Sequence, residues 1–465
     1  MYLILLVSFT VSLHAGADDA TKALTTDIPE TWKYESEYEM PDPITDKWWK
    51  GFGDPTLDTL LNLAVTGNYD VAMALKNMEY AAAAVNMAKS RYYPVIGASA
   101  GWEKARTSAY TGSNKALPMT QDFFNLGLQA SWEIDVFGKI RESVKAEKKN
   151  WHASKAEYAA TMLSLCSQVA QTYIRLRAYQ KELMVANELS ESQKKVMEIA
   201  SVRHEVTLAS GLDVSQAKTV YYSTLSTVPS IRTAIATTIE SLEVLMGDSQ
   251  MPASLRNSLE REREIPQHSM PFGVGVTADL LRRRPDIVAA EYKLAAAAAQ
   301  TGIAKKDFLP TLSLNASIGT EAHRLGNLFK RDALTYSVAP TLSWTIFSGF
   351  SRKYAVEEAK IEMQSQIDNY NKTVKTAFSE VNNAMVTYTN SLERIGLLNE
   401  VLAESIRSYE YSLDQYKQGL SPFLNLLNSQ IDVLNYNNQL IEERAAAQEA
   451  VIQLYVALGG GWENN

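Results

Sequence analysis

Apolar residues recur along this chain in two patterns, one typical of long helices and one typical of short strands. Residues 139–209 contain neither Pro nor Gly, and apolar positions recur there every three or four residues. Residues 351–418 show the same spacing and contain only Gly396 as an interruption. A helix of about 70 residues extends roughly 105 Å, far more than the helices of a compact domain. The sequence therefore predicts two very long helices.

Each predicted long helix ends at a break that contains glycine, and a second helix follows. The first break lies at Gly211, and the helix after it covers 212–246 with Pro229 inside it. The second break is Gly419-Leu420-Ser421-Pro422, and the next helix covers 423–458. The sequence thus predicts two helical hairpins. An ordinary antiparallel coiled coil or a spectrin-like rod, with the glycines as simple turns, would give the same periodicity.

Four short segments alternate between apolar and polar residues, as strands with one apolar side do. They form two predicted hairpins, about 92–137 and about 308–348. Along 126–136, for example, Leu, Ala, Trp, Ile and Val occupy one side, while Gly, Gln, Ser, Glu and Asp occupy the other. Aromatic residues suited to a water–lipid boundary lie on these apolar sides or at the strand ends. They are Tyr92, Tyr93, Trp102, Phe123, Phe124, Trp132, Phe137, Phe308, Trp344 and Phe347.

The same alternation is typical of half-buried strands in a soluble antiparallel sheet, and each segment taken singly fits that interpretation. The lipid-facing interpretation is favoured because only four strands occur, in two widely separated hairpins. Four strands cannot close a barrel, and lipid does not tolerate an open sheet edge. A membrane location therefore requires an oligomer, and three chains would supply twelve strands.

The chain also contains an internal repeat. A shift of 216 residues places Pro94 on Pro310, and a shift of 212 places Trp132 on Trp344. Each copy is predicted to contain an Ala-rich helix, a strand hairpin, a very long helix, a break and a further helix. Periodic self-similarity of this kind sets the architecture of a chain.

Composition narrows the class of protein further. The 465 residues include 45 Lys+Arg and 53 Asp+Glu, for a formal net charge of −8, so the basic footprint of a nucleic-acid binder is missing. The apolar run 1–13 is shorter than the roughly 18–20 residues of a membrane-spanning helix. We interpret 1–17 as a signal peptide, although no Lys or Arg precedes its apolar core; an ordinary buried N-terminal segment is the alternative.

The sequence offers no catalytic or metal-binding motif. It contains no G-x-S-x-G, H-E-x-x-H or Walker-type loop, and its single cysteine, Cys166, cannot build a multi-cysteine metal site. The five histidines are scattered, with no two at ligand spacing. The run Arg282-Arg283-Arg284 before Pro285 is more typical of helix-start solvation or a salt bridge than of a phosphate site. We therefore expect no enzyme, no cofactor and no metal.

Four stretches carry a family resemblance. They are Trp48-Trp49-x-x-Phe52-x-Asp54-Pro55-x-Leu57, Leu280-Leu-Arg-Arg-Arg-Pro285-Asp286-Ile287 with Ala290-Glu291, Ala304-Lys-Lys-Asp-Phe-Leu-Pro310, and Ala457-Leu-Gly-Gly-Gly-Trp462. Together with the repeat, they cover nearly all of the chain from residue 45 on. In these features the chain resembles the TolC-like outer-membrane efflux factors, within them the subgroup that serves multidrug efflux systems and is often lipid-anchored.

The resemblance implies an α+β membrane protein of the outer membrane that extends into the periplasm. Its homotrimer would form a 12-stranded β-barrel embedded in outer-membrane lipid, continuing into a long periplasmic α-helical barrel with an equatorial collar. It would be the exit duct of a tripartite pump, with a periplasmic adaptor and an inner-membrane transporter, the RND type being one candidate. The expected organisation is a signal peptide at 1–17, an N-terminal collar segment at 18–60, repeat 1 at 61–247, an equatorial linker at 248–278, repeat 2 at 279–458 and a C-terminal tail at 459–465.

Two departures from the family pattern matter. No cysteine follows the predicted signal peptide, so lipid anchoring is not supported. The acidic residues that often follow the second tip turn correspond here to Asn425 and Asn428, and Asp213 is the equivalent of Asn425 in the first copy. We expect these three residues to form a periplasmic gate. The tips expected to meet the adaptor are Leu208, Ser210, Gly211 and Leu212, with Gly419, Leu420, Ser421 and Pro422.

The rival interpretation is a non-catalytic periplasmic coiled-coil scaffold. It would be soluble without detergent, and it leaves the outward positions of Trp102, Trp132 and Trp344 unexplained. The resemblance implies that the transporter, and not the duct, selects the exported compound.

Overall fold

The computed structural model describes residues 47–106, 108, 119–268 and 283–460. The predicted signal peptide, most of the N-terminal collar segment and part of the linker and tail therefore lie outside the described residues. The chain divides into two compact units. Unit 1 contains Asn77–Lys155 and Ala289–Asn371; unit 2 contains the described residues of Asp27–Lys76, Ala156–Val288 and Lys372–Asn465.

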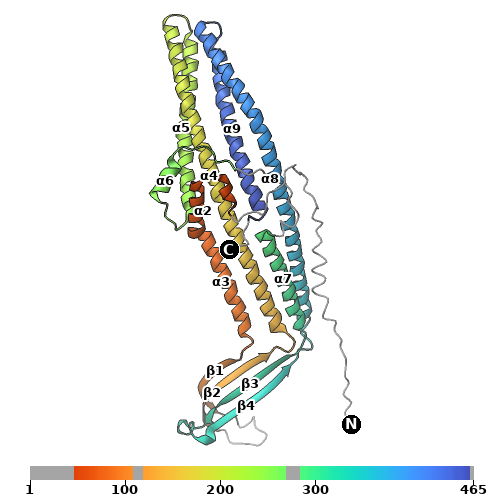
Figure 1. Ribbon diagram of the computed structural model, residues 1–465. Helices are drawn as coiled ribbons and strands as arrows, with labels where there is room; N and C mark the ends of the chain where they lie inside the picture. The colour runs from red at the N-terminus through yellow and green to blue at the C-terminus, as the bar shows by residue number, and fades with distance from the viewer. Residues whose placement is uncertain (1–46, 107, 109–118, 269–282, 461–465) are drawn as a thin grey trace. The chain divides into compact units, whose positions relative to one another are not determined.

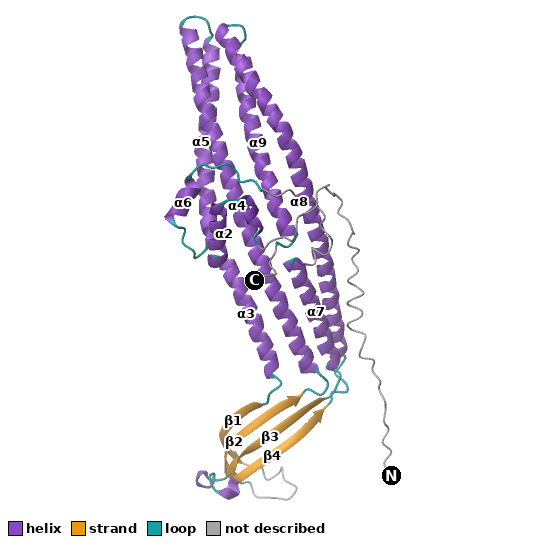
Figure 2. Ribbon diagram, viewed as in Figure 1, coloured by secondary structure: helices purple, strands orange, loops and turns teal. Residues whose placement is uncertain are grey.

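Helices make up most of the described chain, and four strands form its one sheet (Figures 1 and 2). In chain order the elements are η1 (Trp48–Phe52), α2 (Pro55–Gly67), α3 (Tyr69–Ser90), β1 (Val95–Arg106), β2 (Thr120–Ile134), α4 (Lys139–Glu205), α5 (Gly211–Met246), α6 (Ala253–Glu260), α7 (Pro285–Lys306), β3 (Thr311–Ala322), η3 (Leu325–Asn327), η4 (Arg331–Ala333), β4 (Leu334–Ser343), α8 (Ser351–Gln418) and α9 (Phe423–Ala457). The series α3-β1-β2-α4-α5 recurs as α7-β3-β4-α8-α9.

The two very long helices are confirmed. Helix α4 has 67 residues and α8 has 68, and Gly396 does not interrupt α8. Pro229 lies inside α5 without ending it. The boundary expected between 60 and 61 is wrong, however, because it falls in the middle of α2. That helix begins at Pro55, where the Asp54 carboxylate accepts a hydrogen bond from the backbone N–H of Thr56, a standard N-cap.

All four strands form one antiparallel sheet in the order β1-β2-β3-β4. The two predicted hairpins are therefore joined by pairing between β2 and β3. Ala130 of β2 pairs with Ile96 of β1 and also with Ala316 of β3. Ala316 in turn pairs with Val338 of β4. Because paired residues point to the same side of a sheet, the apolar sides of all four strands form one continuous face.

Strand β4 is shorter than predicted. It ends at Ser343, whereas the alternation suggested that it continued to Ile346. After the strand, the indole N–H of Trp344 donates to the carbonyl of Phe308, and the guanidinium of Arg352 donates to the carbonyl of Thr345. These bonds hold the connection to α8 in place of further ladder pairing.

The core of unit 2 surrounds the middle of α4. Trp48 of η1 stacks on Tyr455 of α9, with ring centroids 5.4 Å apart, and both belong to a buried cluster that also includes residues of α2, α4, α5 and α6. The described parts of 18–60 and 248–278 thus pack together. The stretch 248–278 is not simply a polar linker, because it contains α6, whose Leu255 and Leu259 are buried.

Both helical hairpins turn with the same backbone motif. At the end of α8, Gly419 has φ +75°, its N–H bonds to the carbonyl of Tyr416, and the N–H of Leu420 bonds to the carbonyl of Gln415. This is a Schellman C-cap. The first hairpin repeats it with Thr207 at φ +61°. The prediction that Gly211 forms the first break is therefore wrong, because Gly211 is the first residue of α5.

Thr207 strains this first turn, because a β-branched residue disfavours a left-handed conformation. Thr207→Gly should stabilise the turn by about 1 kcal/mol, since glycine adopts positive φ without a Cβ clash. The readout is hydrogen exchange of the amides between residues 203 and 213, which should slow.

The matched control is Thr219→Gly on the exposed helical surface of α5, where glycine should destabilise by about 1 kcal/mol. Faster exchange at the tip of Thr207→Gly would contradict the assignment of strain to this residue.

Candidate functional site: sheet faces and helix tips

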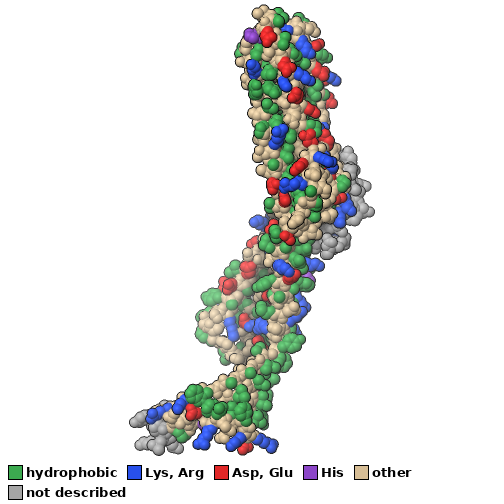
Figure 3. Space-filling view, turned by 90° about the vertical axis from the view of Figure 1, so that its left-hand side faces the viewer, with side chains coloured by type: hydrophobic (Ala, Val, Ile, Leu, Met, Phe, Trp, Pro, Cys, Tyr) green, Lys and Arg blue, Asp and Glu red, His purple; other side chains and the backbone are tan. Residues whose placement is uncertain are grey.

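One face of the sheet exposes large apolar side chains over its whole length. Figure 3 shows hydrophobic side chains gathered over the sheet. The exposed residues on this face are Ile96, Trp102, Leu126, Leu128, Ile318, Tyr336, Val338 and Leu342. A contiguous apolar surface of this kind marks contact with a membrane or with another protein.

The other face is polar and carries a hollow of about 300 Å³. Its polar lining comes from Gln129, Ser131, Asn315, Ser317 and Ser337, together with small residues such as Gly97. None of the residues that line the hollow is charged. At the hollow, this face can therefore line an aqueous path without favouring either sign of charge.

Each copy of the repeat has a tryptophan at the helix end of the sheet, and both form the same kind of hydrogen bond. The indole N–H of Trp132 donates to the carbonyl of Tyr92, and that of Trp344 donates to the carbonyl of Phe308, each at 3.0 Å. At the opposite end Trp102 donates to the carboxylate of Asp122 at 3.2 Å. Each ring is thus anchored by its polar edge, as aromatic residues at a membrane–water boundary are.

Two of the aromatic residues predicted to face lipid, Phe123 and Tyr92, are not exposed on the apolar face of the sheet. Phe123 pairs with Glu103 and lies on the polar side, because Phe124, its neighbour along the strand, pairs with Trp102 on the apolar side. Tyr92 is half-buried against a cluster formed by α3 and α4. Tyr93, Phe137, Phe308 and Phe347 are exposed near the strand ends.

Of the predicted gate residues, Asp213 and Asn425 lie in the first turns of α5 and α9, and Asn428 lies in the second turn of α9. The hydroxyl of Ser210 donates to the carboxylate of Asp213 at 2.7 Å and accepts the Asp213 N–H at 3.2 Å, which caps α5. The side-chain amide of Asn425 donates to the hydroxyl of Ser421 at 3.0 Å. Asn425 and Asn428 are exposed. Within one chain, Asp213 and Asn425 each bond to a serine at the start of their own helix.

Sequence reasoning missed a cationic contact that joins the two tips. The guanidinium of Arg203, near the end of α4, donates to the carbonyl of Lys417 at the end of α8 at 2.8 Å. It also lies over the ring of Tyr416, 5.0 Å from the centroid. Burial raises the pKa of the Tyr416 hydroxyl, and the nearby Asp213 carboxylate raises it further, whereas Arg203 opposes this shift.

Four leucines are exposed at the tips: Leu208, Leu212, Leu420 and Leu424. Beneath them a small core packs residues of all four long helices, with Phe423 and Leu426 of α9 fully buried against Val196 of α4 and Tyr416 of α8. The tips are therefore apolar at their surface as well as small at their turns. Leu424 was absent from the predicted set.

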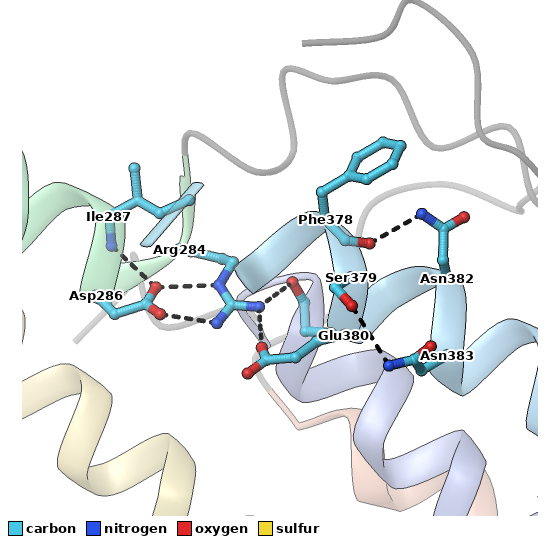
Figure 4. A network of polar contacts seen from close by, with 9 residues as sticks. Arg284, Asp286, Ile287, Phe378, Ser379, Glu380, Asn382 and Asn383 are labelled. Carbon is cyan, nitrogen blue, oxygen red and sulfur yellow. Dashed lines mark hydrogen bonds and ion pairs between the residues drawn. The ribbon is translucent and has the colours of Figure 1, made fainter. Parts of the chain in front are cut away.

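Two of the sequence motifs meet in unit 2, where Figure 4 shows Arg284 between Asp286 and Glu380. The guanidinium of Arg284 donates to both carboxylate oxygens of Asp286, at 3.0 and 2.7 Å, to Glu380 of α8 at 2.7 Å, and to the carbonyl of Ala457 in α9 at 3.0 Å. Gly459 has φ +89°, and a Cβ there would lie 3.3 Å from the Arg284 backbone. The salt-bridge interpretation is confirmed for Arg284, which joins three helices.

Metal and thiol chemistry find little support in the described part of the chain. Residues 47–106, 119–268 and 283–460 contain no group of three His, Cys, Asp or Glu side chains that could hold a metal ion. Burial raises the pKa of the Cys166 thiol to about 12, so the reactive thiolate form is disfavoured. None of the helices in these ranges is both long and apolar enough to cross a bilayer.

Comparison with known proteins gives a consistent result. The family model described as outer membrane efflux protein matches residues 60–248 and 276–460. The chain is 28% identical to the probable efflux pump outer membrane protein TtgC of Pseudomonas putida, over 89% of this chain and 85% of that protein. It is 26% identical to the pyoverdine export outer membrane protein OpmQ of Pseudomonas aeruginosa, over 94% and 92%.

Solved structures agree with these matches. The outer-membrane channel OprN superimposes with a TM-score of 0.85 at 26% identity, covering 92% of this chain and 99% of that one. The CmeC outer membrane channel of Campylobacter jejuni gives 0.85 at 25% identity, covering 94% of each. Given this match over both copies of the repeat, the chain belongs to the outer membrane efflux protein family and is an efflux channel of the outer membrane.

Proposed function

We propose that three copies of this chain form the exit duct of a tripartite pump, through which small molecules leave the periplasm. The observation that carries the proposal is the sheet. It has an exposed apolar face, a polar face whose hollow is lined by uncharged residues, and two outer strands, β1 and β4, each with one unpaired edge. In a four-stranded antiparallel meander β1 and β4 run in opposite directions, so β4 of one subunit can pair with β1 of the next. Three subunits would close a ring of twelve strands.

Helix surfaces support the same assembly. On α3, Met73, Tyr80 and Met87 recur at intervals of seven residues and are exposed, Tyr80 by 78%. On α8, Tyr354 and Ile361 show the same interval and are also exposed. A heptad stripe of large apolar side chains requires a partner helix. A neighbouring subunit would supply it.

The rival coiled-coil scaffold accounts for the helices but not for the sheet. It would leave the whole apolar face of β1–β4 in water, at a cost of roughly 25 cal/mol for each Å² of apolar surface. Relatives are named for the export of toluene, antibiotics and pyoverdine, which differ widely in polarity. An inner face with an uncharged hollow suits a duct that passes whatever the transporter delivers, by passive transport.

The closed state of the duct would be held at the tips. Asp213, Asn425 and Asn428 from three chains would narrow the opening, and the contact of Arg203 with Lys417 would keep the two hairpins together. An adaptor that docks on the exposed leucines would separate the hairpins and open the path. The inner-membrane transporter supplies the energy.

The gate is tested with Asn425→Ala/Asn428→Ala in planar bilayers. Removing two polar side chains from each of three subunits should raise single-channel conductance by about twofold or more, because the narrowest ring widens. Asn437→Ala, further along α9, is the matched control and should leave conductance unchanged. Equal conductance in the double variant and the wild type would remove the gate from these positions.

The docking role is tested with Leu208→Asp/Leu420→Asp in cells that lack their own outer-membrane efflux channel. Charge in an apolar interface should abolish efflux, because both carboxylates would have to be desolvated on docking. Ser223→Asp/Ser226→Asp adds the same charge at exposed positions of α5 and should keep efflux. Intact trimers with normal drug export in the leucine variant would refute docking at the tips.

A further inference from the structure

We propose that the loop end of the sheet binds phosphorylated glycolipid headgroups of the outer leaflet; this rests on the proposed function, which places that end at the outer membrane surface. The binding surface is named here the basic rim. It consists of Lys104 and Arg106 at the end of β1, and Arg324, Lys330 and Arg331 in the β3–β4 connection. All five side chains are exposed, and none forms an ion pair with another residue of the described ranges.

The strand residues of the basic rim lie on the lipid side of the sheet. Lys104 pairs with Asp122 and Arg106 pairs with Thr120, in unbroken register with the pair Trp102 and Phe124. Since alternate residues share a face, Lys104 and Arg106 continue the apolar face beyond its last tryptophan. Long cationic side chains at this position reach the headgroup level.

At the opposite end of the same sheet, the cationic side chains form ion pairs with carboxylates of this chain. There Arg91 pairs with Glu133 at 3.5 Å, Arg141 with Asp135 at 3.3 Å, and Lys306 with Glu142 at 3.2 Å. Lys139 forms a close ion pair with Asp307. The chain thus pairs its cations with carboxylates at the helix end, whereas no described carboxylate forms an ion pair with the basic rim. Anionic headgroups would supply the counter-charge for the rim.

The β3–β4 connection exposes both apolar and cationic side chains, and this combination suits contact with lipid. Its short turns η3 and η4 tuck Leu328, only 6% exposed, and Ala333 into the protein. Phe329 instead projects into solvent with 80% of its surface exposed, and Leu325 is exposed as well. These apolar side chains alternate with the three cations of the segment, a composition typical of interfacial segments that bind anionic lipid.

Two of the four described acidic residues near this end lie on the polar inner face of the sheet. Glu103 pairs with Phe123 and Glu321 with Asn125, which places both carboxylates on the polar inner face. Asp122 remains on the outer face, where it accepts the hydrogen bond of Trp102, and Asp332 lies in η4. The loop end therefore carries the five cations of the basic rim, with Asp122 opposite Lys104 and Asp332 next to Arg331 as carboxylates. Figure 3 shows Lys and Arg side chains at this end of the sheet.

The test uses the full-length protein, purified as it assembles in detergent, and measures retention of labelled lipid in phosphatidylcholine bilayers. The probes are bis-phosphorylated lipid A, its dephosphorylated counterpart and phosphatidylglycerol. Wild type should bind the phosphorylated glycolipid about a hundredfold more tightly than the dephosphorylated one, and added salt should reduce the difference.

The variant Lys104→Gln/Arg106→Gln/Lys330→Gln/Arg331→Gln should lose this preference. Lys194→Gln/Lys195→Gln/Lys372→Gln/Lys375→Gln removes the same number of charges from exposed helical positions and should keep it. Equal binding of phosphorylated and dephosphorylated lipid by the wild type would overturn the proposal, as would a preference for phosphatidylglycerol over lipid A. Loss of the preference in both quadruple variants would also overturn it. Channel conductance should be normal in both variants, so failure of lipid binding is distinguishable from failure of the duct.

Discussion

A sheet that exposes one apolar face and has two unpaired edges cannot be stable alone in water or in lipid. Water penalises the face formed by residues such as Leu128 and Val338. Lipid would cover that face, but it penalises the unbonded N–H and C=O groups along the outer edges of β1 and β4. The proposed closure with other copies would satisfy both requirements. Under this proposal, assembly and the aqueous path depend on the same four strands.

Short connections that are fixed by side-chain hydrogen bonds join this sheet to the long helices α4 and α8. Each copy leads from strand to helix through only a few residues, and side chains fix the connection. The carboxylate of Asp135 accepts the N–H groups of Ile140 and Arg141 at the start of α4. In the second copy Arg352 bonds back to the carbonyl of Thr345. Such bonds set the direction in which each helix leaves its strand.

Much of the fold was predictable because periodicity reports which sides of an element are apolar. The lengths of α4 and α8 and the existence of four strands followed from that periodicity alone. The end of β4 did not, because the apolar alternation continues past Ser343 while hydrogen bonds from Trp344 and Arg352 replace the ladder. Thr207 was missed as the turn residue because a β-branched residue at positive φ contradicts the usual preference for glycine.

The candidate site was predictable in its surfaces but not in its contacts. The pattern of apolar residues along the sequence identified the apolar face and the tips. The contacts did not follow from it, because they join positions more than 170 residues apart: Arg203 lies against Lys417, and Arg284 lies against Gly459. No local pattern reports such pairs. The measurement that bears most directly on the closed ring is amide hydrogen exchange of the protein purified in detergent. Closure predicts that β1 and β4 are protected as fully as β2 and β3, whereas rapid exchange along their outer edges would contradict it.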